Sequence, residues 1–159
     1  MSEARPTIIA GNWKMNKTNR EAVAFIEGLA PLVKDSSAQV LLAVPFTALA
    51  PAAEAARGTS IAIGAQNLSE HENGAFTGEI SGEMLKEAGA VFVIIGHSER
   101  RSLFNETDVL VNKKLHRVFE AGLIPIMCIG ENKADREKNI TEAVIERHLL
   151  ESLKGLSPK

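Results

Sequence analysis

The sequence predicts an α/β fold built from parallel βα units, and three observations lead to this class. Five short apolar runs occur along the chain, and they lack the polar alternation of half-exposed strands. Longer segments with apolar residues at helical spacing separate these runs. No low-complexity segment or internal linker interrupts the alternation. The predicted order is βαβαβαβαβα, with right-handed crossovers and a parallel sheet.

The strand candidates are near-continuous apolar runs, as expected for strands that are covered on both faces. In chain order they are Thr7–Asn12, Val40–Phe46, Ile61–Gln66, Val91–His97 and Ile124–Gly130. Two architectures fit five such units. One is a doubly wound open sheet, and the other is part of an eight-stranded barrel, which typically needs about 250 residues.

The first helix carries a clear start signal, and the last one a stop signal at Gly155 and Pro158. Thr18 and Glu21 have the spacing of a capping box, in which each side chain binds the other residue's backbone N–H. Apolar residues then recur at helical spacing at Ala22, Phe25, Ile26, Leu29 and Val33. The last helix is expected to begin at Ala134 or Thr141 and to end at Leu153.

Two further helices are expected in the middle of the chain. Ser81 predicts the start of one that ends near Gly89, because serine caps helix N-termini and glycine commonly follows helix C-termini. Asn105 predicts the start of another that stops at Gly122. Its apolar face would contain Val111, Leu115, Val118 and Phe119.

Length and composition indicate one domain over residues 1–159 and exclude several classes. Eighteen Lys and Arg against 20 Asp and Glu give a net charge of −2, which argues against nucleic-acid and polybasic membrane surfaces. No apolar run approaches the roughly 20 residues that span a bilayer. The polar, acid-containing start does not resemble a secretory signal. The single cysteine, Cys128, cannot form an internal disulfide, so we expect a cytoplasmic protein.

Residues with useful chemistry follow four of the predicted strands. Active sites form at the carboxyl ends of strands in both candidate architectures. The first strand ends at Asn12 and Lys14, the third at Gln66, the fourth at His97 to Arg101, and the fifth at Cys128 to Glu131. An amide, an ammonium, an imidazole, carboxylates and guanidinium groups would therefore meet at one edge of the sheet.

Each of these residues also has a structural interpretation, which the pattern alone leaves open. Lys14 could be a solvated surface lysine, Asn12 could fix a turn, and His97 could be structural. If His97 is functional, the helix start after it disfavours an imidazolium, and a neutral imidazole can donate one N–H to a substrate oxygen. Glu99 could pair with Arg100, Arg101 or Lys14, and Cys128 could be a small packed apolar residue.

The sequence also contains three further histidines and a polar loop at residues 69–79. His71, His116 and His148 lie in loop or helix patterns that indicate no catalysis, and no paired-histidine spacing supports a metal site. The loop is polar and rich in glycine, yet it carries Phe76 and Thr77 near its centre. Phe76 would either fold back onto its own core or insert with the loop into a partner.

Five motifs together resemble the triosephosphate isomerase family, in its order and spacing. They are GNWKMN at 11–16, GAQN at 64–67, GAFTGE at 74–79, IIGHSERR at 94–101 and CIGE at 128–131. The resemblance covers essentially the whole chain. It implies a TIM-barrel type of fold and the interconversion of dihydroxyacetone phosphate and glyceraldehyde 3-phosphate in glycolysis and gluconeogenesis, with no metal and no organic cofactor.

The resemblance also implies a role for each matching residue of the catalytic centre. Asn12 and Lys14 would bind the substrate, and Lys14 would place positive charge near the enediolate oxygen. His97 would be the neutral electrophile, a role for which this family is itself the established example. Glu99 would hold Lys14, and Cys128 would be a buried support residue.

A homodimer interface is implied as well. Thr77 and Phe76, at the tip of the protruding loop, would reach a second subunit near its Asn12 and Lys14. Glu79 and Arg100 would pair across the interface. Gln66 would help to order the same region.

The match departs from the family at the C-terminal side. The sequence ends at Lys159, where a sixth strand would begin, and no glutamate here occupies the position of the family's catalytic base, Glu131 included. We therefore expect an incomplete barrel of about five units whose isolated chain is inactive. Its open strand edges predict self-association or pairing with a chain that supplies the missing strands. Two alternatives are a non-catalytic assembly fragment and an open-sheet domain that binds a small phosphorylated ligand, although no phosphate-binding glycine motif supports the second.

Overall fold

The computed structural model describes residues 5–157. The extreme N-terminal residues used in the secretory argument and the end at Lys159 lie outside this range. The strands are β1 Ile8–Asn12, β2 Gln39–Val44, β3 Ile61–Ala65, β4 Phe92–Ile95 and β5 Ile124–Met127. They form one sheet in the order β1-β2-β3-β4-β5, and the register pairs β1 with β2, β2 with β3 and β3 with β4 in parallel. This confirms the predicted class of parallel βα units of the barrel type, in an incomplete barrel.

Helices occupy each connection. They are α1 Asn19–Val33, α2 Leu49–Ala55, α3 Gly82–Glu87, α4 Ser98–Leu103, α5 Asp108–Glu120, α6 Lys133–Glu137 and α7 Thr141–Ser152, with a 3-10 turn η1 at Phe46–Ala48. The chain forms two compact units, and the three boundaries between them fall after Gln66, inside α3 and inside β4. Unit 1 contains the residues up to Gln66 together with Glu83–Val93. Unit 2 contains Asn67–Gly82 and the residues from Ile94 onward.

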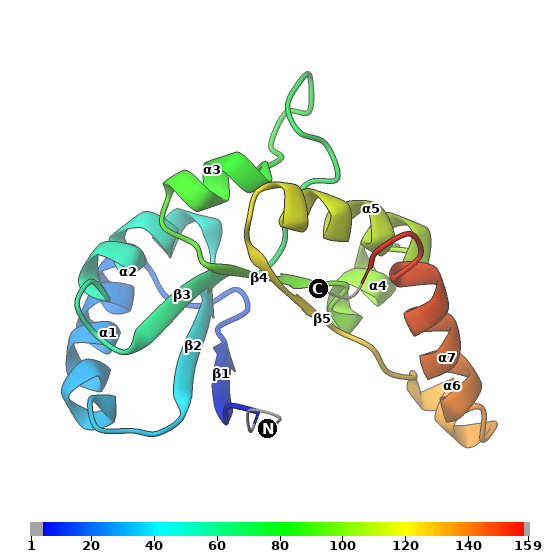
Figure 1. The fold of residues 1–159 in the computed structure, drawn as a ribbon, viewed down its shortest axis with the longest axis horizontal. Coiled ribbons are helices and arrows are strands. Elements are labelled where there is room, and N and C mark those ends of the chain that lie inside the picture. Colours follow the sequence, from blue (N-terminus) through cyan, green and yellow to red (C-terminus); the bar gives the residue numbers. More distant parts are fainter. Residues whose placement is uncertain (1–4, 158–159) are drawn as a thin grey trace. The chain divides into compact units, whose positions relative to one another are not determined.

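In unit 1, α1 and α2 lie side by side along one face of the strands (Figure 1). The predicted capping box is present: the Thr18 side chain accepts from the Glu21 N–H, and the Glu21 carboxylate accepts from the Thr18 N–H at 2.7 Å. The helix buries Ala22 and Ile26, which lie four residues apart and so share one face. Apolar burial on that face fixes α1 against the rest of unit 1.

In unit 2, α5 packs against β5 and α7. The prediction that Asn105 caps α5 is wrong, because Asn105 adopts a left-handed backbone with φ of +56°, whereas an N-cap residue is normally extended. Thr107 has the extended backbone instead, and its hydroxyl accepts from the Leu110 N–H at 3.2 Å. The helix start expected after His97 is present as a separate short helix, α4, which ends before α5 begins.

The predicted last helix is interrupted. The two alternative starting points correspond to two helices, α6 and α7, which are separated by Asn139 with φ of +55°. The helix predicted after Ser81 is present as α3, and Gly89 ends it with φ of +95°. Within residues 5–157 no helix is both long and apolar enough to span a membrane.

Candidate functional site

The unit 1 part of the candidate site is a turn directly after β1. The Asn12 side-chain oxygen accepts from the Lys14 backbone N–H at 2.9 Å, and Lys14 has a left-handed backbone with φ of 53°. Gln66, directly after β3, donates from Nε2 to the Lys14 carbonyl at 2.9 Å and to the Ala43 carbonyl at 3.0 Å. Because a non-glycine residue seldom adopts this conformation, these bonds hold Lys14 in a backbone state it would otherwise leave.

The unit 2 part begins where β4 passes into α4. His97 is the N-cap residue of α4, and its Nδ1 accepts from the Glu99 N–H at 3.3 Å. The Glu99 Oε2 lies 3.4 Å from the same nitrogen. An Nδ1 that accepts a hydrogen bond leaves the proton of a neutral imidazole on Nε2. The arrangement therefore presents an N–H donor on the far side of the ring.

The charged neighbours of Glu99 have partners of their own. Arg100 Nε donates to Glu106 Oε1 at 2.5 Å, and Arg101 Nη1 donates to Asp108 Oδ1 at 2.6 Å. Both arginines therefore pair with other carboxylates, while the Glu99 carboxylate lies next to His97 Nδ1. The structure places Asn12 and Lys14 in unit 1, and His97 and Glu99 in unit 2.

Cys128 follows β5, and its N–H donates to the Ile95 carbonyl at 2.8 Å. Its side chain is half-buried, and this burial raises the pKa of the thiol, although the Arg101 charge lowers it somewhat. Cys128 is therefore a neutral thiol near the end of β4. Glu131, directly after Gly130, pairs with Arg136 at 3.1 Å.

The residues expected at an interface lie on the loop of residues 69–79. All of residues 71–79 are exposed, and Phe76 is 41% exposed. The Phe76 ring stacks on His71 of the same loop, with centroids 3.7 Å apart and an angle of 6°, and does not fold back onto the core. Insertion of the loop into a partner stays a prediction. Thr77 and Glu79 are exposed on the same loop.

Two polar clusters in unit 2 were missed from the sequence. The first centres on the buried Lys114 ammonium, whose Nζ donates to Glu106 Oε1 at 2.5 Å and to Asn67 Oδ1 at 2.8 Å. Arg100 joins this cluster through its own bond to Glu106 Oε1. Lys114 does carry a sequence signal, because it lies three residues after Val111 and so falls on the apolar face predicted for that helix. A charged residue on such a face needs a buried partner.

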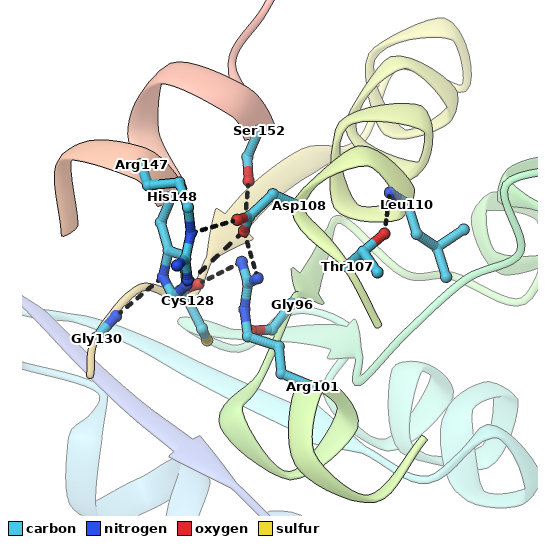
Figure 2. Close-up of polar contacts among 10 residues, drawn as sticks. All are labelled: Gly96, Arg101, Thr107, Asp108, Leu110, Cys128, Gly130, Arg147, His148 and Ser152. Carbon is cyan, nitrogen blue, oxygen red and sulfur yellow. Dashed lines mark hydrogen bonds and ion pairs between the residues drawn. The ribbon is translucent and has the colours of Figure 1, made fainter. Parts of the chain in front are cut away.

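The second cluster surrounds Asp108 (Figure 2). Its carboxylate accepts from Arg101, from Arg147 Nε at 3.2 Å and from Ser152 Oγ at 3.5 Å, while His148 Nε2 lies 3.8 Å away. Burial raises the pKa of Asp108, but the bond from Arg101 and the nearby charges outweigh it and hold the pKa below its ordinary value. Burial and then the Arg101 charge lower the pKa of His148, so His148 is a neutral acceptor for the Gly130 N–H at 3.5 Å.

No cluster of three or more His, Cys, Asp or Glu residues within 5–157 is arranged to hold a metal ion. Unit 1 carries an amide and an ammonium after β1, at Asn12 and Lys14, and unit 2 carries an imidazole N–H and a carboxylate after β4, at His97 and Glu99. Such groups can hold an anionic substrate and donate a hydrogen bond to a carbonyl oxygen.

Comparison with known proteins identifies the family. The triosephosphate isomerase sequence model matches residues 7–159. A triosephosphate isomerase of Clostridium botulinum (Type A) is 52% identical over 153 residues, which cover 96% of this chain and 62% of that protein. One from Acetivibrio thermocellus is 50% identical over 154 residues, which cover 97% and 61%.

A solved structure identifies the same family. The crystal structure of triosephosphate isomerase from Bartonella henselae matches with a TM-score of 0.91 and 38% identity, over 96% of this chain and 64% of that one. The chain thus spans about three fifths of the length of the curated relatives. On both its sequence and its fold, this chain belongs to the triosephosphate isomerase family.

Proposed function

We propose that this chain supplies the electrophilic half of a catalytic centre that interconverts dihydroxyacetone phosphate and glyceraldehyde 3-phosphate. The observation that carries the proposal is the hydrogen bond from the Glu99 N–H to His97 Nδ1 at 3.3 Å. It leaves Nε2 as the donor that a carbonyl oxygen of the substrate requires when an adjacent C–H proton is removed. The site needs no metal and no organic cofactor for this role.

Two residues of unit 1 would complete the electrophilic half. The Lys14 ammonium would stabilise the negative charge that develops on the enediolate oxygen. Asn12 would keep Lys14 in its turn, as the 2.9 Å bond between its side chain and the Lys14 N–H supports. Glu99 would hold the Lys14 ammonium as well as facing His97.

The proton-abstracting base would come from outside the 159 residues. No glutamate of this chain matches the family's base position, and a general base contributes about 10²–10⁴-fold to the rate. We therefore expect no measurable isomerisation by these residues alone.

We also propose self-association through the loop of residues 69–79. The exposed Phe76, with Thr77 beside it, would enter a second copy near Asn12 and Lys14, and Glu79 would pair with Arg100 of that copy. A chain that supplies further strands is the competing partner, and the apolar edge of β1, where Ile9 is 60% exposed, favours it. The single free cysteine is consistent with a cytoplasmic location.

A chimaera tests the catalytic proposal. Residues 7–157 of this chain would replace the matching stretch of the Clostridium botulinum relative, and isomerisation of glyceraldehyde 3-phosphate would be followed with a coupled dehydrogenase. We expect turnover that His97→Gln lowers by about 10²–10⁴-fold, because the variant loses the imidazole donor. His116→Gln, in α5, is the matched control and should keep full activity.

Two results would overturn the proposal. One is a folded chimaera with no turnover, and the other is equal turnover in the parent chimaera and its His97→Gln variant. The 159-residue chain would be assayed beside its own His97→Gln variant, so that a trace of host isomerase gives the same background in both. Sedimentation of the parent chain and of its Thr77→Arg variant distinguishes self-association through the loop from association through β1, because only the first should be lost in the variant.

A further inference from the structure

Arg101 joins the ends of two strands through one buried guanidinium group. Its Nε donates to the Gly96 carbonyl at 2.8 Å, and its Nη2 donates to the Cys128 carbonyl at 3.4 Å. Its Nη1 donates to Asp108 at 2.6 Å, and only 14% of the side chain is exposed. Figure 2 shows Arg101 beside Gly96, and because Gly96 directly precedes His97, Arg101 holds the backbone next to His97.

The backbone at Gly96 is shaped to admit this guanidinium. Gly96 has φ of +67°, and a Cβ placed there would lie 3.0 Å from Arg101 Nη2 and 2.9 Å from Val111 Cγ2. A side chain at this position would displace either the guanidinium or α5. The passage from β4 into α4 is therefore built around Arg101.

Asp108 holds Arg101 in place. Its carboxylate also accepts from Arg147 and Ser152 of α7 (Figure 2). A charged hydrogen bond at 2.6 Å between a guanidinium and a partly buried carboxylate is among the stronger polar contacts in proteins.

The His97 ring stands between two partners that favour opposite tautomers. The Glu99 N–H, 3.3 Å from Nδ1, requires Nδ1 to be an acceptor and so favours the proton on Nε2. The Glu99 Oε2, 3.4 Å from Nδ1, would instead accept a proton carried by Nδ1. A small movement at the start of α4 would change the balance between these two bonds.

We propose that Arg101 is a positioning residue for His97, which selects the Nε2–H tautomer by fixing the Gly96 carbonyl and, with it, the first turn of α4. This inference rests on the proposed function, because only the Nε2–H tautomer can donate to the substrate carbonyl. Arg101 touches neither substrate nor the reacting atoms in this role.

The test measures the His97 tautomer in the ¹⁵N-histidine-labelled 159-residue chain, by long-range ¹H–¹⁵N correlation at alkaline pH. His97→Gln assigns the signals. Arg101→Lys keeps a cation for Asp108 but removes the Nε–H that binds Gly96. We expect the ratio of Nε2–H to Nδ1–H tautomer to fall about fivefold, which corresponds to about 1 kcal/mol, the net value of one hydrogen bond.

Arg147→Lys is the matched control. It is the same substitution, and it removes an Nε–H that binds the same carboxylate, but Arg147 is 58% exposed and lies on α7. We expect no change in the His97 ratio for this variant. An equal change in both variants, or an unchanged ratio in Arg101→Lys, overturns the proposal.

If Arg101→Lys does not fold, Asp108→Asn decides the question. It leaves Arg101 intact but removes the charge that orients it, and we expect the ratio to fall in the same direction. An unchanged ratio in folded Asp108→Asn then overturns the proposal. The tautomer ratio is measured without substrate or turnover, so the two proposals fail separately. An inactive chimaera refutes the proposed function. An active chimaera, together with an unchanged tautomer ratio in Arg101→Lys, refutes only the role of Arg101.

Discussion

Replacing Lys114 by methionine should destabilise the protein more than any substitution on the solvent face of α5. The ammonium is 3% exposed and binds the Glu106 carboxylate, which is 2% exposed, and the side-chain oxygen of Asn67. Methionine has a similar length but no donor. The change therefore leaves a buried carboxylate and a buried amide without their shared partner.

The expected size follows from the contacts that remain. Removing one member of a buried ion pair costs about 3–5 kcal/mol, because the other charge stays buried. Arg100 still donates to Glu106 Oε1 in the variant, so we expect the lower end, about 3 kcal/mol. Within the described residues Glu106 Oε2 has no hydrogen-bond partner, so it cannot replace the lost bond. With a urea m-value of about 2 kcal/mol/M, the unfolding midpoint should fall by about 1.5 M.

The loss of unfolding free energy in Lys114→Met should also depend on pH. Burial raises the pKa of Glu106, but the hydrogen bonds from Lys114 and Arg100 outweigh it and hold the pKa below its ordinary value. The carboxylate of the parent protein therefore adds stability above its unfolded pKa and loses it as pH falls through the lower folded value. In Lys114→Met the folded pKa of Glu106 rises, since burial then opposes Arg100 alone. The difference between variant and parent should shrink from pH 7 to pH 4.5.

Urea unfolding followed by far-UV circular dichroism at these two pH values measures both effects. Lys113→Met, on the exposed neighbouring position of α5, is the matched control and should shift the midpoint little. A midpoint shift of Lys114→Met equal to that of Lys113→Met would refute the reasoning. A shift of the same size at both pH values would show that the cost arises from packing and not from the unpaired charge.

Three further predictions concern unit 2. Thr107→Ala should lower the free energy of unfolding by about 1 kcal/mol in urea titrations, because the Leu110 N–H at the start of α5 loses its acceptor. Burial and the Arg101 charge lower the pKa of His148, so the parent should lose stability as pH falls below about 6.5, and His148→Gln should flatten that dependence between pH 7.5 and 5.5. Burial raises the pKa of Cys128, so a thiol reagent should modify it more slowly in the folded chain than in urea; equal rates would contradict this.

The strands and the first helix could be predicted because their signals are local. Apolar runs without alternation located all five strands, and Thr18 and Glu21 located the start of α1. The predicted strand Val91–His97 extends past β4, because Gly96 and His97 already belong to the passage into α4. The end of β4 could not be located from the sequence, because the apolar run of the strand continues into Gly96 and His97 without an intervening turn signal.

The polar clusters could not be predicted because they depend on partners far along the chain. Asn67 and Lys114 are 47 positions apart, and Asp108 and Ser152 are 44 positions apart. Nothing in the sequence near Asn105 indicates its left-handed backbone, whereas Thr107 two residues later was an equally good cap by residue type. The joint placement of Asn12, Lys14, His97 and Glu99 remains a prediction from the family resemblance.

The aromatic surroundings of Trp13 have a spectroscopic consequence. Trp13 is the single tryptophan of the chain, which contains no tyrosine, and it is buried in unit 1 against the edge of the Phe25 ring at a centroid distance of 5.4 Å. Intrinsic emission excited near 295 nm therefore reports on unit 1 alone, whereas circular dichroism averages over both units. Coincident transitions in the two signals would mark a single cooperative unfolding event, and separated ones would give the order in which the two units melt.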